Sequence, residues 1–164
     1  MTTSRSTCRT ALAAVVLVAG AGTALAVVPA ATADQPLHLV SVAVPERNTD
    51  LDLGELGPSA GDAQVFLDDV QRDGRTVGTN AGSCTITTIT ETRLAVHCTA
   101  TLTLPEGQIT VQGAAEEDPG VEPTGFTWAV TGGTGRWAGA GGEVTGTFRT
   151  DTDTDAVDLE VRLR

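Results

Sequence analysis

Residues 102–146 decide the fold of this chain. They begin with LTLPEGQITVQG (102–113) and end, after an acidic loop, with FTWAVTGGTGRWAGAGGEVTG (126–146). In 102–113 apolar and polar residues alternate on both sides of a Pro-Glu-Gly turn, which is typical of two strands joined by a tight turn. In 126–146 a pair of alternating runs flanks a glycine-rich segment, where the backbone is able to bend sharply. The stretch therefore predicts antiparallel β-structure.

The same alternation continues over most of the chain after residue 33, and no segment there shows a helical period. In 94–104 one face of the predicted strand carries Val96, Cys98, Ala100, Leu102 and Leu104, and the other carries Ala95, His97, Thr99, Thr101 and Thr103. Further strands are predicted at 37–44, 63–66 with an extension as far as 70, 75–80, 84–90, 108–113, 126–131, 144–149 and 157–164. About eight short strands joined by turns indicate an antiparallel sandwich or a closed barrel.

Two acidic segments interrupt this pattern. Residues 45–62 are rich in glycine and proline and have no clear period, so we expect a long loop there. Residues 114–124 are expected to form a second acidic loop.

The first 33 residues have the organisation of an export signal. Arg5 and Arg9 precede the uncharged apolar run 11–28, and Ala-Thr-Ala at 31–33 forms a small-x-small cleavage site. The alternative is a retained membrane anchor, since the apolar run approaches the length that a bilayer requires. We expect cleavage, a mature domain at 34–164, and a secreted protein without a membrane association.

Charge excludes some partners. The signal contains two arginines and no acidic residue, so its removal changes the net charge from −11 to −13, and the chain has no lysine. A field of this sign repels nucleic acid and anionic membranes, and it keeps a secreted domain soluble.

The predicted mature domain has two cysteines, Cys84 and Cys98, which lie symmetrically about Glu91. Opposed positions of an antiparallel hairpin are close enough for a disulfide, and an exported protein meets oxidising conditions. A disulfide is therefore expected. The alternative is a reactive pair of thiols.

Three motifs that resemble functional sites lack their structural context. Gly133-Thr134-Gly135-Arg136-Trp137-Ala138 matches a dinucleotide fingerprint, but no helix follows it, so we interpret Gly132, Gly133 and Gly135 as a structural turn. Asp151, Asp153 and Asp155 resemble the start of a calcium loop, but that loop's glycine and terminal acid are missing. The adjacent acids Asp68-Asp69 and Glu116–Asp118 are expected to be solvated charges. No metal and no cofactor are expected.

The opening stretch resembles the allene oxide cyclase and dirigent barrel superfamily. GQITVQG (107–113) followed by TGGTGRWAGAGGEV (131–144) is similar to a pair of segments in those proteins. Val44–Arg47, Gly61–Phe66 and Ala81–Cys84 are similar to upstream segments of the family. The resemblance implies an all-β, eight-stranded antiparallel barrel with a hydrophobic cavity, and oligomers such as dimers or trimers.

The resemblance also implies binding of an apolar small molecule, with cyclisation or coupling steered by shape. The plant cyclases use a strand-one glutamate and an asparagine two residues later; Ala43 and Pro45 stand at these positions, so both groups are absent. The sequence does not decide whether the protein is an enzyme, and a cyclase-like isomerase is the activity implied if it is. The alternative is a non-catalytic extracellular binding or structural domain. Candidates for the cavity lining are His97, Phe126, Trp128 and Val130.

Overall fold

The structure is a computed structural model that describes residues 35–150 and 154–164. The predicted signal peptide, 1–33, lies outside the described residues, as do Asp151 and Asp153 of the calcium-like motif. Among the residues described, no helix is long and apolar enough to cross a membrane.

The described portion of the chain is almost entirely β-structure. Its elements are β1 (Leu37–Val42), the 3₁₀ turn η1 (Pro45–Arg47), β2 (Thr49–Leu51), β3 (Ala63–Arg72), β4 (Arg75–Thr90), β5 (Arg93–Leu104), β6 (Gly107–Glu117), β7 (Gly125–Gly133), the 3₁₀ turn η2 (Gly135–Trp137), β8 (Gly142–Phe148) and β9 (Ala156–Leu163).

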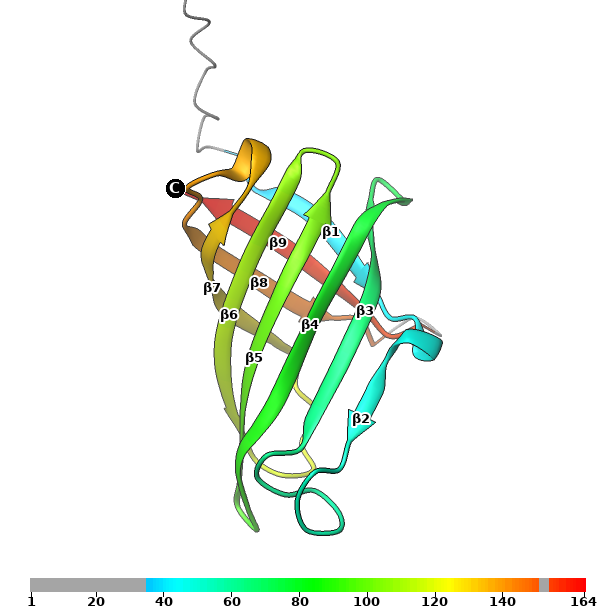
Figure 1. The fold of residues 1–164 in the computed structure, drawn as a ribbon, viewed down its shortest axis with the longest axis vertical. Coiled ribbons are helices and arrows are strands. Elements are labelled where there is room, and N and C mark those ends of the chain that lie inside the picture. Colours follow the sequence, from blue (N-terminus) through cyan, green and yellow to red (C-terminus); the bar gives the residue numbers. More distant parts are fainter. Residues whose placement is uncertain (1–34, 151–153) are drawn as a thin grey trace, which may run out of the picture. The chain divides into compact units, whose positions relative to one another are not determined.

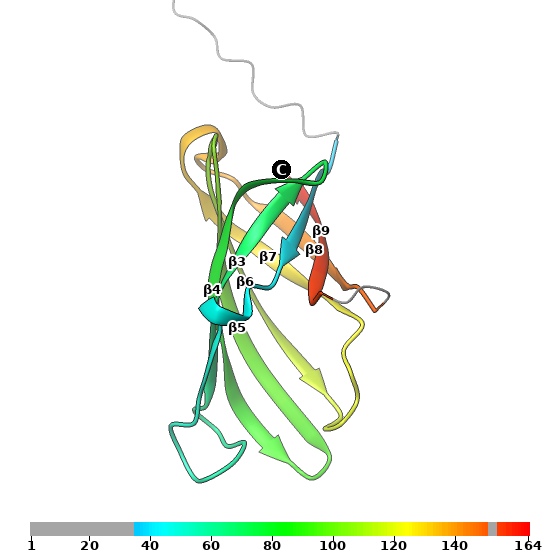
Figure 2. The same ribbon diagram turned by 90° about the vertical axis from the view of Figure 1, so that its right-hand side faces the viewer.

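Eight of the strands form a closed antiparallel barrel (Figures 1 and 2). Each strand from β3 to β9 pairs with the next, β9 pairs with β1, and β1 pairs with β3 to complete the ring. The fold prediction is confirmed. One edge of β3 is shared, because β1 pairs with Asp69–Gln71 and the extra strand β2 pairs with Ala63–Val65.

The alternating apolar residues point into the barrel. On β5 Cys98, Ala100, Leu102 and Leu104 are buried, whereas Thr99 and Thr103 on the other face are exposed. The core cluster comprises Leu39, Val70, Ala100, Leu102, Leu104, Ile109, Val111, Val130, Trp137, Val144, Leu159 and Val161. This burial is the main force that stabilises the sheet in a closed form.

Three predicted boundaries were wrong. The segment 45–62 contains η1 and β2 before its loop begins, and β6 continues through Ala114–Glu117, which was expected to be loop. The predicted strands 75–80 and 84–90 are one strand, β4, because Ala81 to Ser83 continue its pairing with β3 and β5. The strand segments among these are held by pairing with neighbouring strands, whereas η1 is held by local backbone bonds to Val44 and Pro45.

The predicted disulfide joins Cys84 to Cys98, with the Cα atoms 4.0 Å apart. The two-residue turn of the β4–β5 hairpin is Glu91–Thr92, and Thr90 lies opposite Arg93. Continued without interruption, this register would place Cys84 opposite Thr99. A bulge between Ile86 and Thr88 inserts one residue and brings Cys84 opposite Cys98.

Asp62 organises the loop between β2 and β3. Its carboxylate is buried and accepts hydrogen bonds from the backbone N–H groups of Leu53 (2.9 Å), Gly54 (3.3 Å) and Ser59 (2.6 Å). These donors favour the charged form, so they lower the pKa of Asp62 below its usual range, with the Leu53 N–H as the largest cause.

We predict that acid opens this loop. A carboxyl group with a lowered pKa stabilises the folded loop fully above its unfolded pKa of about 3.9, and this contribution disappears as the pH falls through the folded value. The protection factors of the Leu53, Gly54 and Ser59 amides against hydrogen exchange should therefore fall below about pH 4, and in Asp62→Asn they should be low already at pH 7. Asp52→Asn is the control, because Asp52 accepts only one long bond, from Gly57. Equal exchange in both variants would contradict this role.

Candidate functional site

A polar cluster lies on the interior face of the barrel. The Ser41 hydroxyl donates to Asp68 Oδ2 (3.2 Å), the Asn48 amide donates to Asp68 Oδ1 (3.2 Å), and the Asn80 amide donates to Ser41 Oγ (3.1 Å). Ser41 is buried on β1, on the face that also carries the apolar Leu37 and Leu39. We call Ser41, Asn48, Asp68 and Asn80 the interior polar cluster.

The two adjacent acids of β3 have different environments, because neighbouring residues of a strand point to opposite faces. Asp68 shares the interior face with Phe66 and with Val70, which is completely buried. Asp69 points outward and forms an ion pair with Arg47 (2.5 Å). The expectation that Asp68 is a solvated charge was wrong, since the closed barrel turns one face of β3 inward.

Aromatic side chains form a second interior feature. The rings of Phe126 and Trp128 on β7 stack with their centroids 4.0 Å apart, and Phe148 on β8 contacts Phe126 edge-on at 5.9 Å. Phe148 is 36% exposed, and its N–H donates to Thr124 in the β6–β7 loop. This aromatic wall, Phe126, Trp128 and Phe148, therefore extends from the interior to solvent at the end of the barrel that carries this loop.

Three interior rings lie directly on glycines of the neighbouring strands. Phe66 lies over Gly82, Trp128 over Gly113, and Phe126 over Gly146. A Cβ atom at any of these glycines would be closer than 3.0 Å to the ring above it. The glycines therefore leave the space that each ring occupies against the neighbouring strand.

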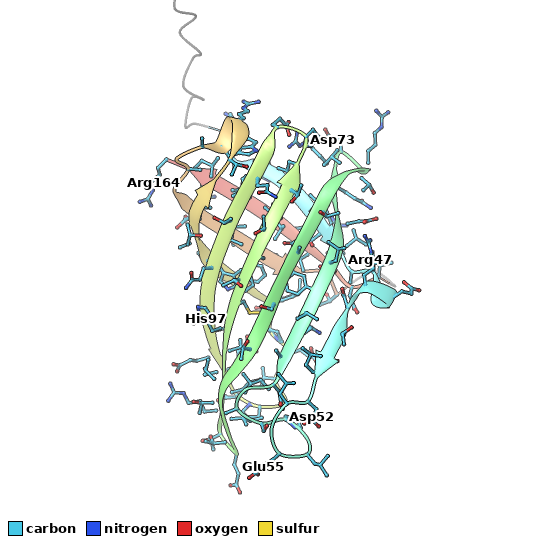
Figure 3. All side chains as sticks on the ribbon, viewed as in Figure 1. Arg47, Asp52, Glu55, Asp73, His97 and Arg164 are labelled. Carbon is cyan, nitrogen blue, oxygen red and sulfur yellow. A yellow bond between two sulfur atoms is a disulfide. The ribbon has the colours of Figure 1, made fainter. Side chains whose placement is uncertain are left out.

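The other predicted site residues lie elsewhere. Val130 is buried in the core cluster. His97, labelled in Figure 3, belongs to the outward threonine face of β5, and its Nε2 is 3.0 Å from the amide nitrogen of Gln112. Gly132 and Gly133 end β7, and Gly135 begins η2 with a φ of +61°. Thus Phe126, Trp128 and Val130 face inward, whereas His97 does not.

The opposite end of the barrel is closed by η2 and the β5–β6 turn. Trp137 is buried there, with the Arg136 guanidinium 5.2 Å from its ring. Arg72 on β3 donates to Glu106 (2.9 Å), and this bond is the main cause that lowers the pKa of the Glu106 carboxyl. The pair places two opposite charges at this end, which balance each other.

Two grooves lie on the outer surface. One, of about 500 Å³, runs where β1 leaves β3 and is lined by the carboxylates of Asp73, Asp158 and Glu160. Asp158 and Glu160 form ion pairs with Arg149 and Arg162. The other, of about 260 Å³, crosses β4 to β7 and is lined only by uncharged residues: Ala81, Gly82, Ser83, Thr99, Ala100, Thr101, Thr110, Val111, Gln112 and Thr131. Neither contains the interior polar cluster or the aromatic wall.

The donor groups do not gather as metal ligands do. Within residues 35–150 and 154–164, no three His, Cys, Asp or Glu side chains are placed to hold one ion. The interior instead offers one carboxylate, one hydroxyl, two amides and flat rings, a set suited to orienting an organic molecule by shape and hydrogen bonds.

Comparison with known families agrees with the strand order, because both indicate a barrel. The family described as allene oxide cyclase barrel like domain matches residues 40–161. The chain belongs to this family. Among curated proteins none matches the chain.

Solved structures share the fold. Pyocyanin demethylase is 28% identical, with a TM-score of 0.65 over 77% of this chain and 98% of that protein. The pterocarpan synthase dirigent protein PsPTS1 is 17% identical, with a TM-score of 0.59 over 77% of this chain and 92% of its own. The Diels-Alderase AbmU from Streptomyces koyangensis is 16% identical, with a TM-score of 0.58; the alignment covers 79% of this chain and 63% of AbmU.

Sequence reasoning missed the interior polar cluster. A signal for it was present, because Ser41 follows Leu37 and Leu39 at period two, and Asp68 lies between Phe66 and Val70 at period two. Asn48 and Asn80 carry no comparable signal, since only the closure of the barrel brings them to Asp68 and Ser41.

We predict that Gly113→Ala disturbs the aromatic wall. The added methyl group occupies the space of the Trp128 ring, so the ring must move, and overpacking of this kind costs about 1–3 kcal/mol of unfolding free energy. Urea unfolding followed by tryptophan fluorescence measures both effects. Gly141→Ala is the matched control, since nothing lies within 4 Å of its added Cβ. An unchanged spectrum and midpoint for Gly113→Ala would refute the close packing.

Proposed function

We propose that this protein is exported and binds a planar, mainly apolar small molecule inside its barrel, whose conformation it fixes during a cyclisation or coupling. The observation that carries this proposal is the aromatic wall, which begins in the interior and is exposed to solvent at Phe148. Flat rings of this kind bind other flat rings by offset stacking, at centroid separations of about 4.5–7 Å.

The loop end of the barrel provides the entrance in this proposal. Strands β4, β5 and β6 continue beyond the level of β1, β8 and β9 at this end (Figure 2). The fully buried side chains Val70, Leu102, Ile109, Val144 and Val161 fill the rest of the interior. A ligand would therefore contact the aromatic wall with one face, and the packed core would limit how deeply it enters.

The comparisons support a small-molecule ligand. The structure with 28% identity is named for an enzyme acting on pyocyanin, and the other two are named a pterocarpan synthase and a Diels-Alderase. Catalysis in our proposal consists of positioning, by which a bound conformer close to the reacting geometry lowers the entropic component of the barrier.

A non-catalytic binding protein is the second candidate. Ala43 and Pro45 offer no ionisable group where the plant cyclases have their glutamate and asparagine; the backbone N–H of Ala43 is used in a bond to Asp155, and Pro45 begins η1. Binding without turnover of the ligand would support this candidate.

We predict that 2-naphthylmethanol, a neutral planar probe, binds to the mature protein in equilibrium dialysis. Trp128→Leu should weaken binding about tenfold, because it removes the stacked ring. Trp137→Phe is the control, since Trp137 belongs to the packed end of the barrel. The affinity of this variant for the probe should stay within about twofold of the wild-type affinity. Mass spectrometry of small molecules that copurify with the exported protein then identifies the natural ligand. Absence of probe binding, or equal binding by both variants, would refute the interior site.

We also propose that the protein forms a homo-oligomer through the uncharged groove across β4 to β7. A chain with a strong negative charge associates with itself most readily through a face that carries no charge. Thr101→Glu, which places a carboxylate in this groove, should shift the protein to monomers in sedimentation equilibrium. Thr147→Glu in the other groove is the control. A monomeric wild type would disprove the proposal.

A further inference from the structure

The interior polar cluster has a fixed direction of hydrogen bonding. Asp68 has only acceptor atoms as a carboxylate, so Ser41 and Asn48 must donate to it. Ser41 uses its single proton in this bond and accepts from Asn80 Nδ2. Because the Asp68 carboxylate only accepts, the two hydrogen bonds run in one direction, from Asn80 to Ser41 and from Ser41 to Asp68.

Acceptor capacity remains free in this cluster, together with the second N–H of each amide. Each oxygen of Asp68 accepts one hydrogen bond within the cluster and retains a further lone pair, and Asn80 Oδ1 is buried without a hydrogen-bond partner. A buried acceptor without a partner costs free energy, so a ligand that donates to it gains affinity. The cluster therefore matches a ligand with N–H or O–H donors.

The charge of the cluster is negative and is not balanced by the hydrogen bonds described. The partners of Asp68 are a neutral hydroxyl and a neutral amide. Arg47, which is close in sequence to Asn48, forms its ion pair with the outward Asp69, and Arg72 forms its ion pair with Glu106. A carboxylate in the interior strongly favours a cation over an anion, because electrostatic interactions are larger there than in water.

We infer that Asp68 is the specificity-determining residue of the barrel and selects a planar organic cation, such as an aromatic ammonium, over the matching anion. This inference rests on the proposed function, because it assigns the charge of the ligand that the aromatic wall stacks against. The ammonium donates to Asp68 and Asn80, while the ring contacts Phe126 and Trp128.

The electrostatic field of the whole molecule also favours the binding of cations, and its contribution must be separated from that of Asp68. The chain is strongly acidic, and Asp52 and Glu55 lie in the β2–β3 loop at the end opposite Asp73 (Figure 3). Such a field is screened by salt over about 10 Å at 0.1 M, whereas a charge pair inside the barrel is screened much less. Salt and a matched surface variant therefore distinguish the two effects.

The experiment compares three probes that share one ring system: 2-naphthylmethylammonium, 2-naphthylmethanol and 2-naphthoate. Dissociation constants of the mature protein are measured by equilibrium dialysis at pH 7 in 0.15 M and 0.5 M NaCl. We expect the ammonium to bind at least tenfold more tightly than the alcohol, and the naphthoate at least tenfold more weakly. We expect the preference for the ammonium to persist at 0.5 M NaCl.

Asp68→Asn and Asp69→Asn form the matched pair of variants. Both remove one negative charge from β3, but only Asp68 faces the interior. In Asp68→Asn the ammonium should lose about tenfold in affinity and the alcohol less than about twofold. In Asp69→Asn all three affinities should stay within about twofold of the wild type.

Each outcome is informative. Binding of the alcohol without a preference for the ammonium, or the same loss in both variants, overturns the role of Asp68 and leaves the aromatic site intact. If the preference for the ammonium disappears in 0.5 M NaCl, it comes from the electrostatic field of the surface charges, and the role of Asp68 is overturned as well. If none of the three probes binds, the proposed function fails, and the inference fails with it. If Asp68→Asn does not fold, the salt dependence of the wild-type preference for the ammonium decides whether that preference comes from the interior or from the surface.

Discussion

The close contact between aromatic rings and glycines is the constraint on which the interior of this barrel depends. Phe66, Trp128 and Phe126 each occupy the place where the facing strand would otherwise carry a side chain. A barrel of eight strands is only wide enough for its own side chains to fill it or for one small ligand. The rings fill the space that the glycines leave beside the wall, and they supply the aromatic surface against which another flat molecule can pack.

The barrel has two regions with different packing. Leu102, Ile109 and Val144 fill one region with fully buried side chains, and Trp137 covers that end. The other region contains Phe148, which solvent reaches, and the interior polar cluster, whose members are hydrogen-bonded to one another but leave Asn80 Oδ1 without a partner. The packed region supplies the stability that holds strands β3 and β7 in place, and a precisely held wall can then orient a ligand.

The architecture could be predicted from the sequence, because period-two alternation and turn residues are local signals. The alternation on β5 and the pair Cys84–Cys98 were predicted correctly. The structure of the site could not be predicted to the same extent, because it depends on which strands meet when the barrel closes. Asn48, from a segment that was expected to be loop, reaches Asp68 only because β2 and β3 pair. The outward position of His97 follows from the burial of Cys98. From the sequence alone, either face of that strand was able to form the interior face of the barrel.

The pairing of β1 with β9 has a consequence for the folding of the protein. Residues of β1 are hydrogen-bonded to β9, whose last residues are close to the C-terminus. The ring therefore closes only when two distant parts of the chain meet, and because contacts of such long sequence separation form slowly, closure is expected late in folding. Until closure, the edges of β1 and β9 lack their partners, and an unpaired strand edge is a place where two chains can pair with each other. The Cys84–Cys98 disulfide joins the strands of a single hairpin, so it can form before the ring closes.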